Sequence, residues 1–562
     1  MHIRIEQLNP IIGDLSGNAE LIVQSLEKAE AENIGLLILP EMVVTGYPAQ
    51  DLLENDSFRN SCYDHNRLII SKTKNTALLF GTIIPNESKP GRKMYNAAIL
   101  AKNGQQKGVA CKSLLPTYDV FDDLRYFEPN LEFDCLDLDG LQLGVTICED
   151  IWYNQNEVQY HTYSTDPAQI LKEKGAQIII NISASPYTKS KHENRERMLR
   201  NHARKLRLPV LYSNQTGAHT EIIFDGDSMA VSGSAEVVAR TCSFQPSYND
   251  VHWNQTTGDI EPASSNRRMP PYPVKGPERQ FAAIKTGLRD YVAKTGIAEK
   301  VVLGLSGGID SALVCVIAAE TLGADHVVAV TMPGEFSSAG SVEDSEKLAD
   351  NLGVELHHLG IQPVYDELEN SLAPYFEGHP FGVAEENLQS RIRGTMLMAF
   401  ANKFGYFLLA TGNKSEYAVG YATLYGDMNG ALAIIGDLYK TEVYEMCEWL
   451  NKDYYQKEVI PTAIITKEPS AELRPDQKDI DSLPEYNVLD DILYRYIELQ
   501  ENPGRIISGG YPSEIVNKAI RLVDMNEFKR YQAAPILKLS SKSFGIGRRW
   551  PMVQRWTSNN KK

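Results

Sequence analysis

The chain has 562 residues, of which 43% are hydrophobic and 23% are charged, a composition typical of soluble globular proteins. This length predicts roughly two to four domains, each with enough apolar residues to build its own core. The 56 basic and 73 acidic residues give a formal net charge of −17. Such an acidic chain is a poor candidate for non-specific binding to nucleic acid.

The cysteines and the N-terminus indicate the cellular compartment in which we expect the protein. Seven cysteines are spread widely along the chain without any Cys-x-x-Cys pair, which argues against a disulfide framework or a zinc site and for a reducing environment. The N-terminus has no charged region followed by an apolar run, so no signal peptide is predicted. No run of about 18 apolar residues predicts a transmembrane helix. We therefore expect a cytoplasmic protein with neither a membrane nor a nucleic-acid partner.

The first half of the chain alternates short apolar runs with helical stretches. The dipeptides Asn103-Gly104 and Asp139-Gly140 each separate two such runs. They predict hairpins, because both supply the positive φ angles that two-residue turns require. Mixed strands with helices between them predict a layered α/β sandwich, with the sheets packed inside the helices. Further strands are predicted at 2–7, 34–39, 77–84, 178–182 and 210–213.

The pattern breaks near residue 243 and then resumes in a more regular form. Residues 243–277 are rich in Pro, Ser, Asn and Gly, which indicates an ordered excursion followed by a linker. Beyond this segment, strands and helices alternate regularly, which predicts a doubly wound parallel sheet with ligands at the carboxyl ends of its strands. Ser341, three residues before Asp344, is a candidate helix cap. We thus expect domains at 1–242 and 278–562, with strands of the second at 301–305, 326–332, 355–360 and 406–410.

The segment VVLGLSGGIDSAL, residues 301–313, predicts a strand, a tight glycine turn and the start of a helix. Free N–H groups and the helix dipole make such a junction an anion site. The P-loop pattern GxxxxGK[ST] is absent from it. A plain glycine turn of any α/β domain is the alternative interpretation. SGGIDS also resembles the pyrophosphate loop of the N-type ATP pyrophosphatases, which split ATP between the α and β phosphates and leave AMP on a carboxylate or carbonyl.

Three chemically reactive residues of the first half each follow an apolar strand: Glu41 in LPEMVVTGYP, Lys112 in CKSLLP and Cys148 in TICEDIW. A thiol beside a cation is a better nucleophile, and a nearby carboxylate can move protons. An ammonium can stabilise a tetrahedral oxyanion. Together they are the parts needed to hydrolyse an amide or nitrile through a thioester. Taken singly, each residue is more often buried filler or solvated surface.

The order of these three motifs resembles the nitrilase superfamily. The resemblance implies an αββα sandwich in which Glu41 is the proton acceptor, Lys112 the transition-state stabiliser and Cys148 the nucleophile. It also implies that Glu128, in RYFEPN, is the supporting glutamate. Three further residues match positions at which glutaminase members of the superfamily contact glutamine: Tyr118, Ser185 and Lys191.

The second half resembles the NAD synthetases in MPGEFSSAGSVEDSEKLADNLG, ENLQSRIRG, ATGNKSEYAVGYATLYGDMNG, PSAELRPDQKDIDSLPEY and SKSFGIGRRWP. Together the two halves cover nearly the whole chain, and the combination resembles the glutamine-dependent NAD(+) synthetase family. This resemblance implies a second fold like that of the adenine nucleotide alpha hydrolases. It also implies ATP-dependent amidation of deamido-NAD to NAD through an adenylated intermediate, with ammonia from glutamine and with AMP, pyrophosphate and glutamate as the other products.

The same resemblance implies binding roles in the second half. Deamido-NAD would contact Asn387, Arg391, Glu416 and Lys542. Asp310 and Glu416 would bind Mg²⁺, whose charge offsets the crowded phosphates. Surface charges at Arg391 and Arg393 and a local turn capped by Glu416 are the alternative interpretations. ATP would contact Gly304, Leu305, Ser306, Gly307, Gly308, Ile309, Asp310, Ser311, Thr411 and Lys440.

Other functions stay open at this point. A second amidotransferase with the same loop, such as one that makes GMP or an amidated cofactor, fits the same motifs. A tRNA-modifying pyrophosphatase is disfavoured by the negative charge and by the lack of a basic patch. A regulatory nucleotide-binding protein with inactive sites is disfavoured by Cys148 and the SGGIDS loop. We also expect a homo-oligomer, with glutamine or ammonia, ATP and deamido-NAD as its small-molecule partners.

Overall fold

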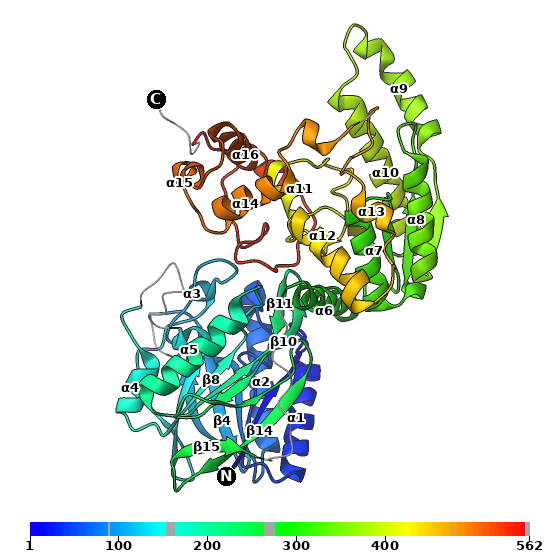
Figure 1. The fold of residues 1–562 in the computed structure, drawn as a ribbon. Coiled ribbons are helices and arrows are strands. Elements are labelled where there is room, and N and C mark those ends of the chain that lie inside the picture. Colours follow the sequence, from blue (N-terminus) through cyan, green and yellow to red (C-terminus); the bar gives the residue numbers. More distant parts are fainter. Residues whose placement is uncertain (88–89, 153–162, 264–275, 476, 557–562) are drawn as a thin grey trace. The chain divides into compact units, whose positions relative to one another are not determined.

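The chain forms two units, Met1–Pro273 and Val274–Lys562, which a computed structural model resolves in side-chain detail (Figure 1). The structure describes residues 1–87, 90–152, 163–263, 276–475 and 477–556. Much of the predicted linker, residues 264–275, lies outside this range. Within it, no helix is long and apolar enough to cross a membrane.

A seven-stranded sheet in the order β15-β14-β1-β2-β3-β4-β5 forms half of the first unit. Strands β1, β2 and β3 are parallel neighbours, and the others pair antiparallel. Strands β14 and β15 come from the segment expected to be an excursion, and β14 pairs along the full length of β1, with His2 opposite His252. The bounds are β1 (His2–Gln7), β2 (Leu36–Ile38), β3 (Ala77–Pro85), β4 (Met94–Lys102), β5 (Gln105–Cys111), β14 (Ser247–Asn254) and β15 (Asp259–Pro262).

A second sheet of six strands has the order β13-β12-β9-β8-β7-β6. Both predicted hairpins are confirmed: Lys102 pairs with Gln105 across one turn, and Leu138 with Leu141 across the other. All four turn residues have positive φ, as such turns require. The bounds are β6 (Leu136–Leu138), β7 (Leu141–Ile147), β8 (Ile178–Ser183), β9 (Val210–Asn214), β12 (Met229–Val231) and β13 (Val237–Arg240), and β10 (Thr216–His219) with β11 (Ile222–Asp225) forms a separate hairpin.

The two sheets face each other, and helices cover their outer faces. Ile5 and Ile147, from different sheets, belong to one buried apolar cluster. Leu37 points the other way, as alternation along a strand requires, and packs in a cluster with Ile22 of the covering helix. The predicted αββα sandwich is therefore confirmed. Its helices are α1 (Leu15–Ala31) and α2 (Asp56–Lys72) on one side, α4 (Pro167–Glu173) and α5 (Lys191–Leu206) on the other, and the short α3 (Asp123–Tyr126).

The second unit contains a five-stranded parallel sheet in the order β18-β17-β16-β19-β20. The chain leaves β16 toward β17 and β18 on one side and later returns to β19 and β20 on the other. The carboxyl end of β16 is therefore a topological switch point, the place where doubly wound sheets bind ligands. The predicted doubly wound parallel sheet is confirmed. The bounds are β16 (Val301–Gly304), β17 (Val327–Thr331), β18 (Glu355–His358), β19 (Phe407–Ala410) and β20 (Leu432–Ala433).

Helices surround this sheet and continue toward the C-terminus (Figure 1). The predicted cap at Ser341 is wrong by three residues. Ser338 caps α8, because its hydroxyl accepts a hydrogen bond from the Ser341 amide, 3.2 Å away. The bounds are α6 (Pro277–Thr295), α7 (Ile309–Leu322), α8 (Ala339–Leu352), α9 (Gln362–Phe376), α10 (Val383–Phe404), α11 (Lys414–Val419), α12 (Lys440–Trp449), α13 (Thr462–Thr466), α14 (Tyr486–Ile497), α15 (Pro503–Ser508), α16 (Ser513–Met525) and α17 (Glu527–Arg530).

Candidate active sites

The first candidate site brings together three residues that follow strands of both sheets. Glu41 comes after β2, Lys112 directly follows β5, and Cys148 directly follows β7. All three side chains are buried. Cys148 has a φ of 46°, in the left-handed region that L-residues rarely adopt. A strained backbone at a candidate nucleophile is consistent with a functional constraint on its direction.

Glu41 is fixed by three donors. Its Oε1 accepts from Lys112 Nζ at 2.8 Å and from Asn96 Nδ2 at 2.7 Å. Its Oε2 accepts from the backbone amide of Ala184 at 2.8 Å. Charge-assisted hydrogen bonds of this kind hold a carboxylate in one orientation. The Glu41 side chain is therefore held in one rotamer.

Lys112 lies between two carboxylates. Besides Glu41, its Nζ contacts Oδ2 of Asp123 at 2.6 Å, and Asp123 also accepts from the Tyr47 hydroxyl at 2.9 Å. Burial lowers the pKa of Lys112, but Asp123 and then Glu41 outweigh burial, and the pKa lies well above its ordinary value. Lys112 therefore keeps its positive charge at neutral pH.

The supporting carboxylate expected at Glu128 lies elsewhere. Glu128 accepts a hydrogen bond from the backbone amide of Arg92 at 2.7 Å, and the second carboxylate on Lys112 belongs to Asp123. The sequence signal for Asp123 is weak, because it is one of two adjacent aspartates in DVFDD. Only its position at the start of α3, next to the Lys112 segment, distinguishes it from Asp122.

The Cys148 thiol is neutral in this environment. Burial raises its pKa, the Glu41 carboxylate raises it further, and Lys112 only partly opposes them. The expectation that a neighbouring cation activates the thiol is therefore wrong for the resting site. A neutral thiol needs a base to take its proton as it attacks, and Glu41 is the oriented carboxylate beside it.

Asp150 ties the nucleophile segment to the lysine segment. Its carboxylate accepts from the backbone amides of Ser113 at 3.0 Å, Leu114 at 2.8 Å and Ile147 at 3.0 Å. Burial raises the pKa of Asp150 to about 7, although these three hydrogen bonds favour the ionised form. Strands β5 and β7 belong to different sheets, so this one side chain sets their loops relative to each other.

Two of the three predicted glutamine contacts lie around Cys148 and the neighbouring Glu149. The Tyr118 hydroxyl donates to the Glu149 carboxylate at 3.0 Å. Lys191 begins α5, and its ammonium interacts electrostatically with Cys148 and Glu149. Burial, and then Arg195, lowers the pKa of Lys191. Glu149 is a polar residue that our sequence analysis missed, although it stands next to the nucleophile in TICEDIW.

Ser185, the third predicted contact, lies on the loop after β8. Its backbone amide donates to Asn214 at 2.8 Å, and its own carbonyl accepts from the Asn214 side chain at 3.3 Å. The preceding residue, Ala184, is the backbone donor to Glu41. The loop therefore belongs to the wall of this site, and Asn214 fixes its conformation.

The second candidate site lies at the carboxyl end of β16. The loop after this strand turns through Gly307, whose φ is 77°, and α7 starts at Ile309. A Cβ on Gly307 would clash with the backbone of Ser341, so only glycine fits there. The Ser311 hydroxyl donates to the Gly308 carbonyl at 3.0 Å and accepts from the Ser306 amide at 3.2 Å. The predicted anion loop is thus held in one shape.

A cavity of about 290 Å³ opens at this loop. Nine of the ten residues predicted to contact ATP line this cavity. The tenth, Gly307, packs against Ser341 instead. Thr411 reaches the cavity from the end of β19, and Lys440 from the first residue of α12. The nine are Gly304, Leu305, Ser306, Gly308, Ile309, Asp310, Ser311, Thr411 and Lys440.

Two carboxylates converge on one cation in this cavity. Lys440 Nζ forms a short ion pair with Asp310 and a longer one, 3.4 Å, with Glu416. Asn413 holds Asp310 from the other side through a 2.8 Å hydrogen bond and also caps the helix that carries Glu416. Burial, and then the charge of Asp310, raises the pKa of Glu416, and Lys440 opposes this shift.

The residues predicted to contact deamido-NAD are less clustered. Glu416 lines the cavity. Asn387 and Arg391, both on α10, instead bond the segment after α11: Asn387 accepts from Thr423 at 2.8 Å, and Arg391 donates to the Leu424 carbonyl at 3.2 Å. The cavity wall on α10 is formed by Ser390, Arg393, Gly394 and Leu397, and the charged residue among them, Arg393, stands two residues after Arg391 in ENLQSRIRG. Burial lowers the pKa of Arg393 to about 10.

Arg393 was not chosen because two arginines two positions apart look alike in sequence, although a helix turns them to different faces. Its side chain is directed inward, since Nε donates to the Met332 carbonyl at 3.0 Å. Lys542 is held through its own carbonyl, which accepts from Lys414 at 3.0 Å. Asp310 and Glu416 are the predicted magnesium ligands. Among the described residues there is no group of three or more His, Cys, Asp or Glu side chains arranged to hold a metal.

Comparisons with known proteins agree with this two-site architecture. The carbon-nitrogen hydrolase family matches residues 2–252, and the NAD synthase family matches residues 280–533. The glutamine-dependent NAD(+) synthetase of Synechocystis sp. is 43% identical over 98% of both chains, and that of Thermotoga maritima is 40% identical over 99% of both. The structure of the glutamine-dependent NAD(+) synthetase from Acinetobacter baumannii in complex with ADP has a TM-score of 0.77 at 35% identity and covers 100% of this chain and 99% of its own.

An αββα sandwich with a buried Glu-Lys-Cys site, joined to a parallel sheet with a nucleotide-type loop, is the architecture of an amidotransferase. The chain belongs to the glutamine-dependent NAD(+) synthetase family.

Proposed function

We propose that the chain converts deamido-NAD to NAD in an ATP-dependent amidation, with ammonia released from glutamine. The observation that carries this proposal is the presence of both complete sites in one chain of this family: Glu41, Lys112 and Cys148 in one unit, and the loop cavity with Asp310 and Lys440 in the other. In this proposal residues 1–242, together with β14 and β15 that complete their sheet, act as the glutaminase, and residues 278–562 act as the synthetase. The products are NAD, AMP, pyrophosphate and glutamate.

At the first site the reaction proceeds through a thioester. The Cys148 sulfur attacks the side-chain amide carbon of glutamine while Glu41 takes the thiol proton. Lys112 stays protonated between its two carboxylates, so it stabilises the tetrahedral oxyanion and does not act as the base. Glu41 then donates the proton to the leaving ammonia. Water hydrolyses the thioester to glutamate, with Glu41 again as the base.

Glutamine binding is the proposed role of Tyr118, Ser185 and Lys191. Tyr118 and Lys191 lie in the electrostatic neighbourhood of Cys148, and Ser185 lies on the loop that donates to Glu41. Burial raises the pKa of Glu149, and the carboxyl oxygens of this residue, which already accept from Tyr118, match the donors of an amino acid's α-ammonium. An amino acid amide is therefore a better fit than a neutral nitrile.

At the second site the nicotinate carboxylate of deamido-NAD attacks the α-phosphorus of ATP, and pyrophosphate leaves. The N-terminus of α7 offers backbone N–H donors to the phosphates, whereas the Ser306 and Gly308 amides donate within the loop and hold its shape. Lys440 adds a positive charge, and Arg393 a second one in the lining of the same cavity. Ammonia then displaces AMP to form the amide. Positioning of the two substrates supplies much of the acceleration.

The residues of this cavity also fit Mg²⁺. Asp310 and Glu416 already converge on one cation, Lys440, and magnesium in nucleotide sites is typically held by one or two carboxylates plus phosphate oxygens. Asp310 and Glu416 would therefore hold the ion, which when bound offsets the negative charge of the phosphates. Asn387, Arg391, Glu416 and Lys542 are the proposed contacts of deamido-NAD. Because Asn387 and Arg391 bond to residues 423–424, they would contact deamido-NAD together with that segment.

A product assay tests the proposed function. The purified chain is incubated with ATP, Mg²⁺ and glutamine, and with either deamido-NAD or xanthylate as the acceptor. Mass spectrometry should find NAD and AMP with deamido-NAD and no amidated product with xanthylate. Amidation of xanthylate, or AMP release without any NAD, would contradict the proposal.

The carboxylate on Lys112 gives a separate prediction. Asp123→Asn removes one of the two charges that orient Lys112, so we expect glutamine hydrolysis to fall at least about tenfold. The matched variant Glu128→Gln should stay near the wild-type rate, because Glu128 contacts the Arg92 amide. Glutamate release by both variants is the measurement. A loss in Glu128→Gln as large as or larger than that in Asp123→Asn would contradict the assignment of the supporting role to Asp123.

Two wider proposals follow from the chain as a whole. All seven cysteines are free thiols, which suits a reducing cytoplasm. A homo-oligomer stays a prediction, which a sizing measurement in solution would test.

A further inference from the structure

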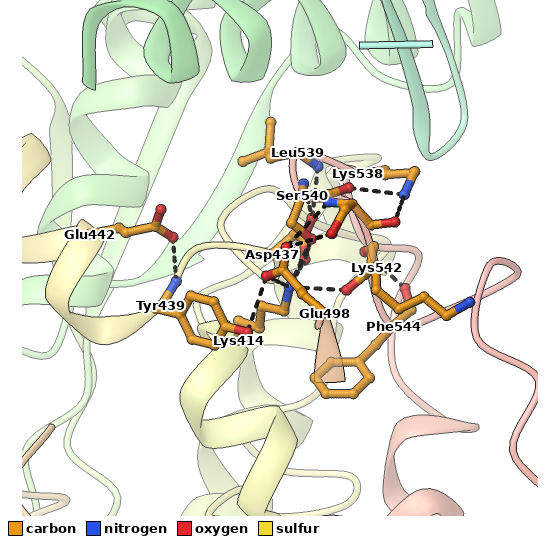
Figure 2. Close-up of polar contacts among 12 residues, drawn as sticks. Lys414, Asp437, Tyr439, Glu442, Glu498, Lys538, Leu539, Ser540, Lys542 and Phe544 are labelled. Carbon is orange, nitrogen blue, oxygen red and sulfur yellow. Dashed lines mark hydrogen bonds and ion pairs between the residues drawn. The ribbon is translucent and has the colours of Figure 1, made fainter. Parts of the chain in front are cut away.

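Lys414, the first residue of α11, is a lysine with no exposed surface. Its ammonium contacts four oxygens: Asp437 Oδ1 and Glu498 Oε1, both at 2.9 Å, Ser540 Oγ at 2.7 Å and the Lys542 carbonyl at 3.0 Å (Figure 2). A buried ammonium is costly unless it is fully paired. Here the partners come from three distant parts of the sequence.

Among the residues that the structure describes, no strand pairs with the backbone of the C-terminal segment 538–544, and side chains take that role. The amides of Leu539 and Ser540 both donate to Asp437 Oδ2, at 2.7 and 2.6 Å. The Lys538 ammonium donates to the Ser540 and Ser541 carbonyls at 2.9 and 3.2 Å. Backbone polar groups that are buried must find partners, so charged side chains determine the path of this segment.

The same side chains sit directly beside the residues of the second site. Lys414 is two residues before Glu416 on α11, and Asp437 is three residues before Lys440, which starts α12. The Lys414 amide donates to the Leu438 carbonyl at 2.8 Å and joins the two helix starts. The cluster and the cavity therefore share the starts of α11 and α12.

The cluster is charged rather than neutral. Burial lowers the pKa of Lys414, yet Asp437 and Glu498 outweigh it, and the pKa is raised overall. Buried ion pairs contribute little net stability compared with apolar residues of the same volume. One attested use of buried charged groups is to select a single arrangement of the chain. In this cluster the segment in contact with the charged groups is 538–544.

We infer that Lys414 is a positioning residue of the synthetase site, which with Asp437 fixes segment 538–544 and so sets the place of Lys542. This rests on the proposed function, in which Lys542 contacts deamido-NAD. Lys542 is tied to the cluster through its carbonyl, and its side chain extends away from the cluster (Figure 2). Lys414 itself touches no substrate in this proposal.

A kinetic comparison tests the positioning role in ammonia-supported synthesis. Lys414→Met should raise the KM for deamido-NAD about tenfold or more, as should Lys542→Ala, with the KM for ATP changed by less than about threefold. Because both act through one contact, the double variant should be no worse than Lys542→Ala alone. The matched control is Tyr439→Phe, which removes one hydrogen bond to Glu498 and leaves every charge in place. It should stay near wild type.

Three results would overturn the inference: an unchanged KM for deamido-NAD in Lys414→Met, effects of Lys414→Met and Lys542→Ala that multiply, or a Tyr439→Phe defect as large as that of Lys414→Met. If the wild-type chain makes no NAD at all, the proposed function fails instead. Basal glutamate release, measured without ATP and deamido-NAD, should be equal in all variants. That readout separates a local change from general misfolding.

Hydrogen exchange tests, without any substrate, whether Lys414 fixes the conformation of segment 538–544. In the wild type the Leu539 and Ser540 amides should exchange slowly, and in Lys414→Met about tenfold or more faster. If Lys414→Met does not fold because Asp437 and Glu498 are left unpaired, Lys414→Met with Asp437→Asn and Glu498→Gln removes all three charges together. Wild-type protection of these two amides in that folded triple variant would overturn the inference.

Discussion

Cys148→Ala is expected to abolish NAD synthesis from glutamine while ammonia-supported synthesis stays within about twofold of wild type. The thiol is the nucleophile for the amide carbon, and neither Glu41 nor Lys112 can replace it, because one is the base and the other a paired cation. Loss of a nucleophile typically costs about 10⁴-fold or more. The measurement is NAD formation with glutamine and with ammonium chloride as alternative donors, at the same ATP and deamido-NAD concentrations.

The control for this experiment is Cys62→Ala, another buried cysteine of the first unit, which lies in the cluster under α1 and α2. It should retain both routes, with at most a modest loss of stability from the smaller side chain. Loss of both routes in Cys148→Ala would mean that the thiol is structural. Retention of glutamine-supported synthesis would mean that another group opens the amide.

Local chemistry explains which parts of the fold could be predicted from sequence. The hairpin turns at Asn103-Gly104 and Asp139-Gly140 were predictable, because the dipeptides themselves supply the positive φ angles. Strand β14 was not, because its residues look polar and irregular. It becomes a strand by pairing with β15 on one side and, on the other, with β1, nearly 250 residues earlier in the chain. Strand β20 has just two residues and leaves no periodic signal.

The residues of the candidate sites also fall into those that the sequence predicts and those that it does not. Cys148 and the SGGIDS loop lie at strand ends that their own sequence reveals. Asp123 and Arg393 do not, because adjacent or nearly adjacent residues of the same charge compete for the role and only the fold chooses between them. From the sequence NKSE alone, Lys414 would be predicted to be a surface lysine. It is buried because three distant segments bring it acceptors.

Asp310→Ala is expected to abolish both the glutamine-supported and the ammonia-supported routes to NAD, by about 10³-fold or more. Asp310 stands at the N-terminus of α7 inside the loop cavity, where it pairs with Lys440 and accepts from Asn413. Without it, Lys440 keeps only the longer pair with Glu416, and one of the two carboxylates proposed to hold Mg²⁺ is lost. AMP and pyrophosphate release should disappear with NAD, since activation of the carboxylate precedes the use of ammonia.

The matched control is Asp325→Ala, an exposed aspartate that follows α7 at its other end. It should keep both routes. Because Asp310→Ala removes a partner of the buried Lys440, Asp310→Asn serves as the second variant: it can still accept from Asn413 and should fold normally, yet lack synthesis. Basal glutamate release should persist in both Asp310 variants, since the glutaminase residues lie in the other unit. Synthesis from ammonia at more than about a tenth of the wild-type rate in a folded Asp310 variant would exclude Asp310 from the ATP site.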